Sequence, residues 1–478
     1  MQRSKSLFGR LIRGVFNQPG SCLQGHADFL ADSSIRVTIP IGQLLGDDDQ
    51  PHQSLLNDDV KADAIYGLSQ DGYYQTLIDV RGVGGGYSAP GFAEQCLSGT
   101  QLYVSRKIIE PNPTITSFTV KMAGLREWVR ISPFVERYTP REDGSLCKQY
   151  SFSFSEEDIP KVILFESDNT KVTLEHNWVL KGGSLPTAHF VHCCESDYDL
   201  SFSFHSPIHL DDAFRNWVLP VRSFICFCMG MRSIVRKMQF LTTGGAKAEF
   251  YIPLVDGREP RDSDLRQMPI TWSSYGEMIP AMLSRWLELG GQAKDAAKRS
   301  VSLLDRDYVT VDTFFLATAQ AFEAISRVGV DQNELDQDEF NRRLRCIETS
   351  GLEPKIIKWT KRKLKYANNK SATELAKTRI EMLGSYGRFV LPNAEPYLRE
   401  HRDTRNYFTH LDPTGKTHIL SDGLDAIINA DTTYLLLYGA ICQLLGFDPD
   451  TLVEAFKQSG FKWSSIMRSQ ERYGIGTT

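Results

Sequence analysis

The chain has 478 residues, of which 41% are hydrophobic and 24% are charged, and its formal net charge is −5. This length favours two or three domains, and the composition is typical of a soluble globular protein. The slightly acidic balance excludes a chain that is basic overall, so contact with nucleic acid would require a local basic surface. No apolar run approaches the roughly 20 residues that span a bilayer. Because the nine cysteines lack paired spacing, we expect a reducing, cytoplasmic environment.

The first twenty residues carry an apolar stripe at helical spacing. The stripe, with Arg and Lys residues between its members, consists of Leu7, Phe8, Leu11, Ile12, Val15 and Phe16. This pattern predicts an amphipathic helix, which would suit a presequence, a membrane-surface helix or an element packed on its own domain. The segment lacks the long apolar stretch of a secretion signal, so we do not expect secretion. We favour the packed element and expect no membrane attachment.

Within the first predicted domain, residues 1–270, the dominant period from about residue 20 to residue 250 is two. Apolar residues alternate with polar ones at residues 35–41, 118–122, 150–154, 172–178 and 200–204. Such alternation predicts half-buried antiparallel strands, separated here by turns that contain Gly or Pro. We therefore expect a β-rich N-terminal domain that is sandwich-like or barrel-like, with one helix around residues 211–231.

Two further features of this region were weighed as possible ligand sites. The glycine run at residues 82–86 lacks the Gly-Lys-Ser/Thr ending of a phosphate loop, so we expect a flexible turn there. A zinc site could in principle form from His192, Cys193, Cys194, Cys226 and Cys228. No C-x2-C spacing supports that site, and free cysteines are commonly buried as small hydrophobic side chains. We expect no metal and no cofactor.

The pattern changes near Tyr275, and residues 271–478 are expected to form an all-α bundle. Apolar residues recur there at helical spacing, and several segments begin at a capping residue or end at glycine. The expected helices begin near residue 279 and continue at 312–329, 338–350, 354–366, 372–383, 394–409, 422–446 and 450–458. The predicted fold class is therefore α+β and multidomain, with a β-rich domain followed by a helical bundle.

A candidate catalytic group lies near the end of the chain. Arg405 is followed directly by Asn406 and, five residues after the arginine, by His410. An arginine fork binds phosphate oxygens, and an imidazole that titrates near neutrality can take or give a proton. With Asn406 to orient either partner, these groups suit cleavage of a phosphodiester without a metal. The alternative is a surface arginine and a histidine that interacts with the dipole at its helix C-terminus.

The spacing of this pair sets a geometric condition. On a regular helix, residues five apart are rotated by about 140° from each other, so Arg405 and His410 do not stack. They would meet only if the helix ends or distorts near Thr409, which Pro413 favours, or if two subunits share one cleft.

A basic segment at residues 355–365 precedes this motif and carries six cations. The candidate RNA-binding residues are Lys358, Lys361, Arg362, Lys363 and Lys365. A helix of this kind can bind an RNA backbone, with Tyr366 available to stack on a base. The alternative is a solvated helix face with Ile356, Ile357 and Leu364 packed inward.

Two parts of the chain resemble a known family. The segment Arg405-Asn-Tyr-Phe-Thr-His410 resembles the R-x(4–6)-H motif of HEPN-domain ribonucleases. The whole layout resembles the Apea-like HEPN group of bacterial abortive-infection proteins, which pair a β-rich N-terminal domain with a C-terminal HEPN bundle. Residues 14–16, 19–20, 25 and 35–41 are similar to the opening of that family, and residues 314–325 are similar to its early HEPN helix.

The resemblance implies His410 as the acid/base group, Arg405 as the phosphate-binding cation and Asn406 as the polar residue after the arginine. It also implies a homodimer through the HEPN bundle, no divalent metal, and products with 2′,3′-cyclic phosphate and 5′-hydroxyl ends. The expected substrate is RNA, with tRNA as the expected class, cut on phage infection. The N-terminal domain is then expected to sense a phage-derived protein or ligand, or to restrain the nuclease. The alternative is a non-catalytic regulator whose bundle binds RNA or nucleotide and whose β-domain recognises a ligand.

Overall fold

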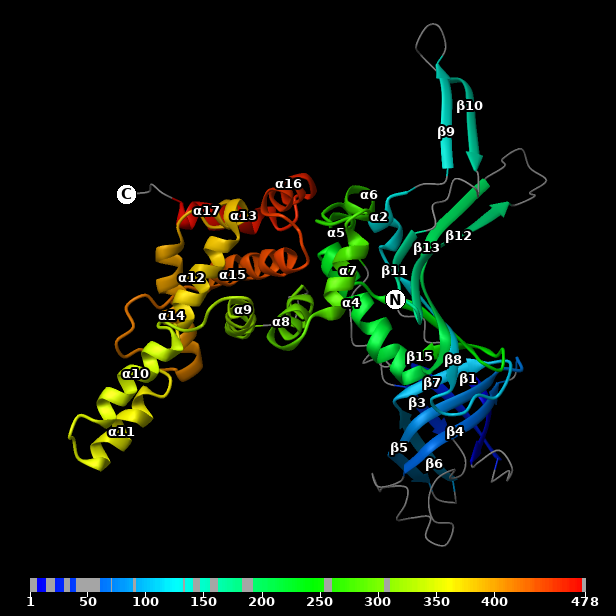
Figure 1. Cartoon of the computed structure of the whole chain (residues 1–478). Helices are drawn as coiled ribbons and strands as arrows, with labels where there is room; N and C mark the ends of the chain where they lie inside the picture. The colour runs from blue at the N-terminus through cyan, green and yellow to red at the C-terminus, as the bar shows by residue number, and fades with distance from the viewer. Residues whose placement is uncertain are drawn as a thin grey trace. The chain divides into compact units, whose positions relative to one another are not determined.

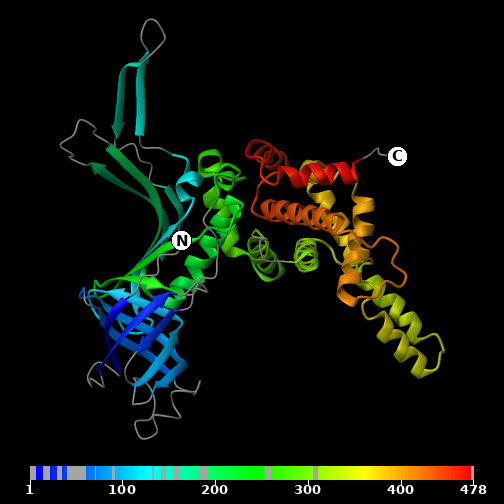
Figure 2. The ribbon, with the colours of Figure 1, turned by 180° about the vertical axis from the view of Figure 1, so that it is seen from behind.

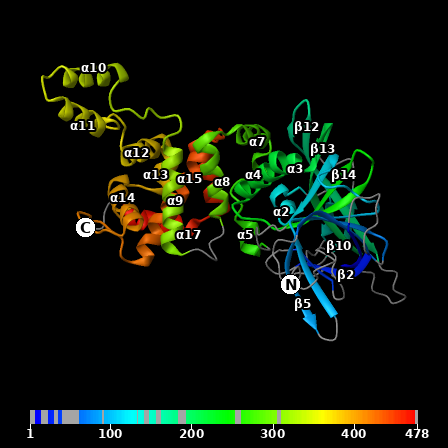
Figure 3. The ribbon, with the colours of Figure 1, turned by 90° about the horizontal axis from the view of Figure 1, so that it is seen from below.

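A computed structural model gives the fold of the chain, which is drawn from three sides in Figures 1, 2 and 3. The residues that it describes are 7–13, 22–29, 35–39, 61–69, 71–88, 92–131, 134–140, 147–154, 162–182, 192–252, 260–304 and 310–474. The chain divides into two compact units, Met1–Arg222 with Ser233–Arg261, and Ser223–Arg232 with Asp262–Thr478. The first is built on antiparallel β-sheet and the second on helices, which confirms the predicted α+β class.

The first unit contains one large antiparallel sheet and a separate hairpin. The large sheet is formed by β1 (Leu7–Arg13), β2 (Cys22–Phe29), β3 (Ile35–Ile39), β4 (Lys61–Ser69), β5 (Tyr74–Ser88), β6 (Phe92–Gly99), β7 (Gln101–Ser105), β8 (Thr114–Met122), β11 (Val162–Glu166), β12 (Thr170–Gly182), β13 (His192–His209), β14 (Val235–Thr242) and β15 (Lys247–Tyr251). The hairpin pairs β9 (Phe134–Pro140) with β10 (Cys147–Phe154).

Part of the large sheet closes into a barrel-like ring. The strands follow the order β5-β4-β1-β2-β3-β6, and β6 pairs again with β5. The long β5 makes this possible, because residues 74–81 pair with β4 and residues 81–88 pair with β6. On β3, Ile35, Val37 and Ile39 are buried and pack in a core with side chains of β4 to β7, as the alternation predicted.

The expected flexible turn at residues 82–86 is wrong. These glycines belong to β5, and the pairing with β6 shifts its register between Gly82 and Gly84. Gly84 has a φ of 145°, a value that favours glycine and is typical of an irregular point in a strand. The run therefore bends a strand rather than ending one.

The predicted N-terminal helix is also wrong, because Leu7–Arg13 form β1. This strand pairs antiparallel with β2 on one side and with β4 on the other. Two ladders of backbone hydrogen bonds outweigh the helical preference of a segment that has Gly9 in its interior. The rest of the predicted segment, at residues 14–16, lies outside the described residues.

Helical structure interrupts the strands where it was expected around residues 211–231. It comprises α3 (Leu210–Ala213), the π-helical turn η1 (Phe214–Val218) and α4 (Leu219–Met229). The short helix α2 (Leu125–Val129), which was not predicted, follows β8 and buries Trp128.

The second unit is a helical bundle. Its helices are the greater part of α4 (residues 223–229), α5 (Asp262–Arg266), α6 (Trp272–Tyr275), α7 (Ile279–Glu288), α8 (Gly291–Ser302), α9 (Val311–Ser326), α10 (Gln337–Glu348), α11 (Pro354–Leu364), α12 (Ala372–Met382), α13 (Gly384–Val390), α14 (Ala394–His410), α15 (Gly423–Leu444), α16 (Pro449–Ser459) and α17 (Trp463–Tyr473). Among the described residues, no helix has both the length and the apolar character needed to cross a membrane.

Helix α15 is the centre of this bundle (Figures 1 and 2). It begins after Asp422, whose side chain accepts a hydrogen bond from the N–H of Leu424, as the predicted cap requires. Nearly every residue from Asn429 to Cys442 is buried, because α8, α9, α13, α14, α16 and α17 all contact this helix. A helix that is buried on all sides is expected to tolerate few changes in side-chain volume.

Gly439 of α15 offers a direct test of this packing. A Cβ atom at this position would overlap the ring of Tyr386, which is fully buried and donates a hydrogen bond to the Leu435 carbonyl. Gly439→Ala is therefore expected to lower the free energy of unfolding by about 2 kcal/mol, despite the better helix propensity of alanine. Urea unfolding followed by circular dichroism measures the change. The matched control is Gly423→Ala in the first turn of α15, where no atom lies within 4 Å of the new Cβ. Equal stability of the two variants would contradict the packing.

Candidate active site

Helix α14 carries the predicted catalytic group and is defined at both ends. At its start the side chain of Asn393 accepts a hydrogen bond of 3.2 Å from the N–H of Glu395. At its end Leu411 adopts a left-handed conformation with a φ of 52°, and its N–H donates to the Tyr407 carbonyl. The helix therefore includes both Arg405 and His410.

Arg405 is held in place by two side chains. Its Nη2 lies 3.0 Å from Oε2 of Glu323 on α9, and its Nη1 donates to Oδ1 of Asn406 at 3.2 Å. Glu323 also pairs with Arg327 at 2.9 Å, so this carboxylate bridges two guanidinium groups. Asn406 thus orients the arginine, and Glu323 ties it to α9 by an ion pair.

His410 lies at the exposed end of α14, and within the described part of the chain the hydrogen-bond partners of the Arg405 side chain are Glu323 and Asn406 rather than His410. The helix is regular through Thr409, whose hydroxyl donates to the Arg405 carbonyl at 2.7 Å. The helix ends one residue later, at His410, so the first condition for bringing the pair together, a helix that ends near Thr409, is met, yet no hydrogen bond joins the two side chains in the described part of the chain. The second condition, two subunits that share a cleft, stays a prediction.

A cavity of about 240 Å³ lies beside Arg405, between α9, the first turns of α12 and one face of α14. It is lined by Ala319, Phe322, Glu323, Ser371, Ala372, Thr373, Ala376, Leu398, His401, Arg402, Arg405 and Asn406. The wall is largely apolar, and its charged or titratable members are two guanidinium groups, one imidazole and the carboxylate of Glu323. Two of the predicted residues, Arg405 and Asn406, therefore line the cavity, and His410 does not.

His401 was missed as a site residue in the sequence. It lies four residues before Arg405, so the two side chains are on the same face of α14, one turn apart. This i,i+4 spacing was visible in the sequence. It gained meaning only when α9 and α12 placed a cavity over that face.

The imidazole of His401 is fixed by its surroundings. It stacks between the rings of Phe315 and Tyr397, with centroid distances of 5.3 and 5.4 Å. Its Nδ1 lies 2.9 Å from Oδ1 of Asn429 and 3.3 Å from the hydroxyl of Thr433. The pKa of His401 is lowered to about 4, chiefly by burial and in part by the charge of Arg405, whereas the hydrogen bond to Asn429 and the charge of Glu323 oppose this shift. The ring is therefore neutral near neutral pH.

This lowered pKa predicts a pH-dependent stability. The folded-state pKa lies below the unfolded value of about 6.5, so the unfolded chain binds more protons between these two values. The stabilisation that the neutral His401 ring gives to the folded chain is fully present above about pH 6.5, and it is lost as the pH falls toward about 4. As the pH falls from about 7.5 to about 5, we expect the loss of this stabilisation to lower the free energy of unfolding by about 2 kcal/mol.

The measurement is urea unfolding of the full chain at both pH values, for the wild type and for His401→Phe. The variant should lack this part of the pH dependence, whereas the control His418→Phe, at an exposed histidine, should keep it. An identical loss of stability in the wild type and in His401→Phe would contradict a ring that stays neutral in the folded chain.

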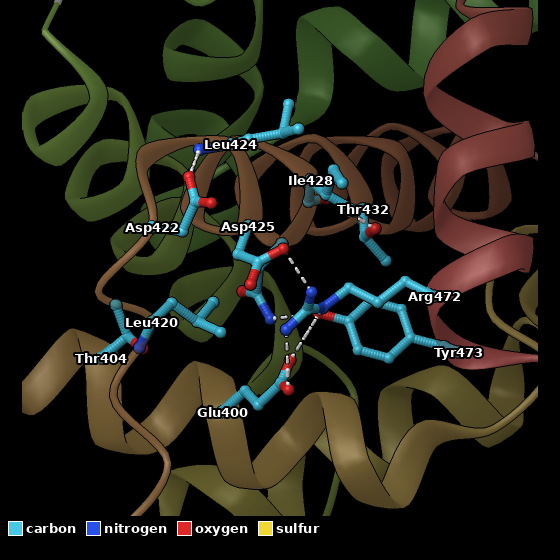
Figure 4. A network of polar contacts seen from close by, with 11 residues as sticks. Glu400, Thr404, Leu420, Asp422, Leu424, Asp425, Ile428, Thr432, Arg472 and Tyr473 are labelled. Carbon is cyan, nitrogen blue, oxygen red and sulfur yellow. Dashed lines mark hydrogen bonds and ion pairs between the residues drawn. The ribbon is translucent and has the colours of Figure 1, made fainter. Parts of the chain in front are cut away.

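A network of hydrogen bonds and ion pairs extends from Asn429, the hydrogen-bond partner of His401. The Asn429 amide donates to the Tyr473 hydroxyl at 3.0 Å, and that hydroxyl donates to Glu400 at 2.9 Å. Arg472 lies between Glu400 and Asp425 and pairs with both carboxylates, as Figure 4 shows. These contacts tie α17 and α15 to α14 and fix the wall of the cavity that carries His401.

The predicted RNA-binding segment forms α11, which pairs with α10 as a hairpin that extends from the rest of the bundle (Figure 3). All five predicted residues, Lys358, Lys361, Arg362, Lys363 and Lys365, are exposed, and Lys361 also pairs with Glu348. The alternative of an inward apolar face is wrong for Ile356, which is 45% exposed. Trp359, at 54%, is exposed as well. The hairpin therefore offers cations and aromatic surface together.

Metal binding has no support within the described ranges, where no three His, Cys, Asp or Glu side chains are placed to hold an ion. Cys226 and Cys228 are buried. The side chains of His192, Cys193 and Cys194 lie outside the described residues.

Two family models match the chain. Residues 22–286 match ApeA N-terminal domain 1, and residues 316–451 match Apea-like HEPN. The second match includes α12, α14 and α15 and most of α9, and therefore the whole lining of the cavity together with His410. Comparisons with curated proteins and with solved structures gave no match.

Proposed function

Because the chain belongs to the ApeA family, with an ApeA N-terminal domain and an Apea-like HEPN domain, we propose that it is a metal-independent endoribonuclease of anti-phage defence. The HEPN domain marks a ribonuclease-type defence protein. The single observation that carries the finer proposal is the placement of Arg405 within the matched HEPN segment. Its guanidinium is fixed by Glu323 and Asn406 at the edge of a cavity.

The proposed reaction is an internal transfer at one phosphodiester of RNA. The ribose 2′-oxygen attacks phosphorus and loses its proton to a base, while the bond from phosphorus to the 5′-oxygen breaks and that oxygen receives a proton. Arg405 stabilises the charge on the crowded phosphate, and His410 carries protons as acid/base. The products have a 2′,3′-cyclic phosphate on one fragment and a 5′-hydroxyl on the other.

The proposed active form is a homodimer through the HEPN bundle. Positions five apart on a helix point in different directions, and His410 is exposed, which supports the proposal that a second subunit completes a cleft around Arg405 and His410. We also propose that the β-rich domain senses a phage-derived protein or ligand, or restrains the nuclease until such a signal arrives.

The α10–α11 hairpin is proposed to bind the RNA backbone, and tRNA is the proposed substrate class. Lys358→Glu/Arg362→Glu reverses two exposed cations one turn apart on α11. In a His410→Ala background, this double variant should bind tRNA at least about 10-fold more weakly. The slope of log affinity against log salt should become shallower by about 1.5.

The matched control is Lys294→Glu/Lys298→Glu, which reverses two exposed cations at the same spacing on α8. It should leave both the affinity and the salt slope close to those of the parent. Equal changes in the two double variants would contradict a role specific to the hairpin.

Incubation of the full chain with total tRNA, with EDTA and separately with Mg²⁺, tests the proposed activity. The proposal expects discrete tRNA fragments in both conditions at similar rates. The cavity also favours a second candidate, a protein that binds RNA or nucleotide without cutting it, because its wall combines apolar side chains with two guanidinium groups. Tight tRNA binding without fragments, in the presence of the activating signal, would support that candidate instead.

A further inference from the structure

The cavity contains two groups of complementary chemistry that lie one helical turn apart. Arg405 offers hydrogen-bond donors and positive charge, whereas His401 offers a neutral ring. Residues four apart on a helix have Cβ atoms about 6 Å from each other. A ligand of the size of one nucleotide unit can therefore contact both side chains at once.

The tautomer of His401 follows from its partners. The Thr433 hydroxyl donates to the Asn429 carbonyl at 2.7 Å, so its oxygen is left to accept. The Asn429 side chain uses its NH₂ group toward Tyr473, so its Oδ1 accepts from the imidazole. Both neighbours of Nδ1 are acceptors, and Nδ1 must carry the hydrogen. The lone pair is consequently on Nε2.

Nε2 is the free end of this ring. It has no hydrogen-bond partner in the described part of the chain, and the residue lines the cavity beside Arg405. A neutral nitrogen lone pair in such a place recognises a hydrogen-bond donor on the ligand.

We infer that His401 is a substrate-binding residue of this site, whose Nε2 accepts a hydrogen bond from the ribose 2′-hydroxyl of the nucleotide that Arg405 holds by its phosphate. This inference rests on the proposed function, because it deepens the recognition of RNA at the same cavity. In RNA the 2′-oxygen and the 3′-phosphate belong to adjacent groups of one nucleotide, which matches the one-turn separation of the two side chains. The contact distinguishes RNA from DNA and holds the attacking oxygen near phosphorus.

The first test changes the substrate and leaves His401 intact. The protein is His410→Ala, which binds without cutting, and the ligands are a substrate RNA and the same RNA with a single 2′-deoxy or 2′-O-methyl nucleotide at the mapped cleavage position. Both modifications remove the donor. Equilibrium binding should favour the unmodified RNA by about 10-fold, as expected for one lost hydrogen bond to a buried acceptor. Equal affinity for the unmodified and the 2′-deoxy RNA would overturn the inference.

The second test changes the protein. His401→Phe, in the same His410→Ala background, keeps a ring between Phe315 and Tyr397 but removes Nε2. The ratio of the affinities for the unmodified and the modified RNA should fall to about one. The matched control is Tyr397→Phe, which removes a hydroxyl that contacts Thr433 behind the imidazole and leaves Nε2 in place. This control should keep the preference. A full preference in His401→Phe would overturn the inference.

These outcomes separate the inference from the proposed function. If the wild type does not cut RNA, the nuclease proposal fails, whatever the deoxy preference is. If the wild type cuts RNA through Arg405 and His410 but His401→Phe keeps the full preference for the 2′-hydroxyl, only the role of His401 fails.

Discussion

Replacement of either Arg405 or His410 by alanine is expected to lower the rate of tRNA cleavage by at least about 1,000-fold. Arg405→Ala removes the charge and the fork that neutralise the phosphate in the transition state. His410→Ala removes the group proposed to move protons. Single-turnover cleavage of tRNA in EDTA measures both variants, and circular dichroism checks that each remains folded.

Two further variants make this result specific. Arg399→Ala changes an exposed arginine on the same helix, where it pairs with Glu395 and does not line the cavity, and it should cut tRNA at a rate close to the wild type. Arg405→Lys keeps the charge without the fork and should fall between the wild type and Arg405→Ala. Unchanged cleavage by Arg405→Ala or by His410→Ala would show that the replaced residue is not part of the active site.

Co-expression of Arg405→Ala with His410→Ala is expected to recover activity that neither variant has alone. A cleft shared by two subunits would receive one intact Arg405 and one intact His410 in a mixed dimer. The recovered rate should exceed that of either variant by about 100-fold. Differently tagged subunits allow the mixed dimer to be purified and assayed.

The control for this experiment pairs Arg405→Ala with the double variant Arg405→Ala/His410→Ala. No dimer of these two chains contains an intact Arg405, so no recovery is expected. If the mixed dimer of the two single variants is as inactive as this control, each subunit holds its own complete site and the shared cleft is wrong.

Much of the fold follows from local pattern. Alternation on β3 and the capping residue Asp422 of α15 both predict the observed elements, because a half-buried strand and a helix start depend on nearby residues. The β1 strand was misassigned because its partners, β2 and β4, supply the hydrogen bonds that decide its conformation. Helices α8, α13 and α17 were not predicted at all. In α8 the buried side is mainly alanine, and α13 is only seven residues long and contains two glycines, so neither has a strong apolar period.

The site shows the same division between local and distant information. Arg405, Asn406 and His410 are recognisable because their chemistry lies in one short segment. The ion pair with Glu323 joins residues 82 positions apart, and the hydrogen bond from His401 to Asn429 joins residues 28 positions apart. Such contacts depend on how α9, α14 and α15 pack. The same packing forms the cavity that His401 lines and occupies its Nδ1 with Asn429 and Thr433.

The chemistry of the fragment ends tests the central claim most directly. Wild-type protein and His410→Ala are incubated with tRNA in EDTA, and the new ends are identified by phosphatase treatment, kinase labelling and mass spectrometry. The account predicts 2′,3′-cyclic phosphate and 5′-hydroxyl ends from the wild type, and none above background from His410→Ala. Fragments with 3′-hydroxyl and 5′-phosphate ends, or cleavage that requires Mg²⁺, would contradict attack by the 2′-oxygen and with it the proposed roles of Arg405 and His410.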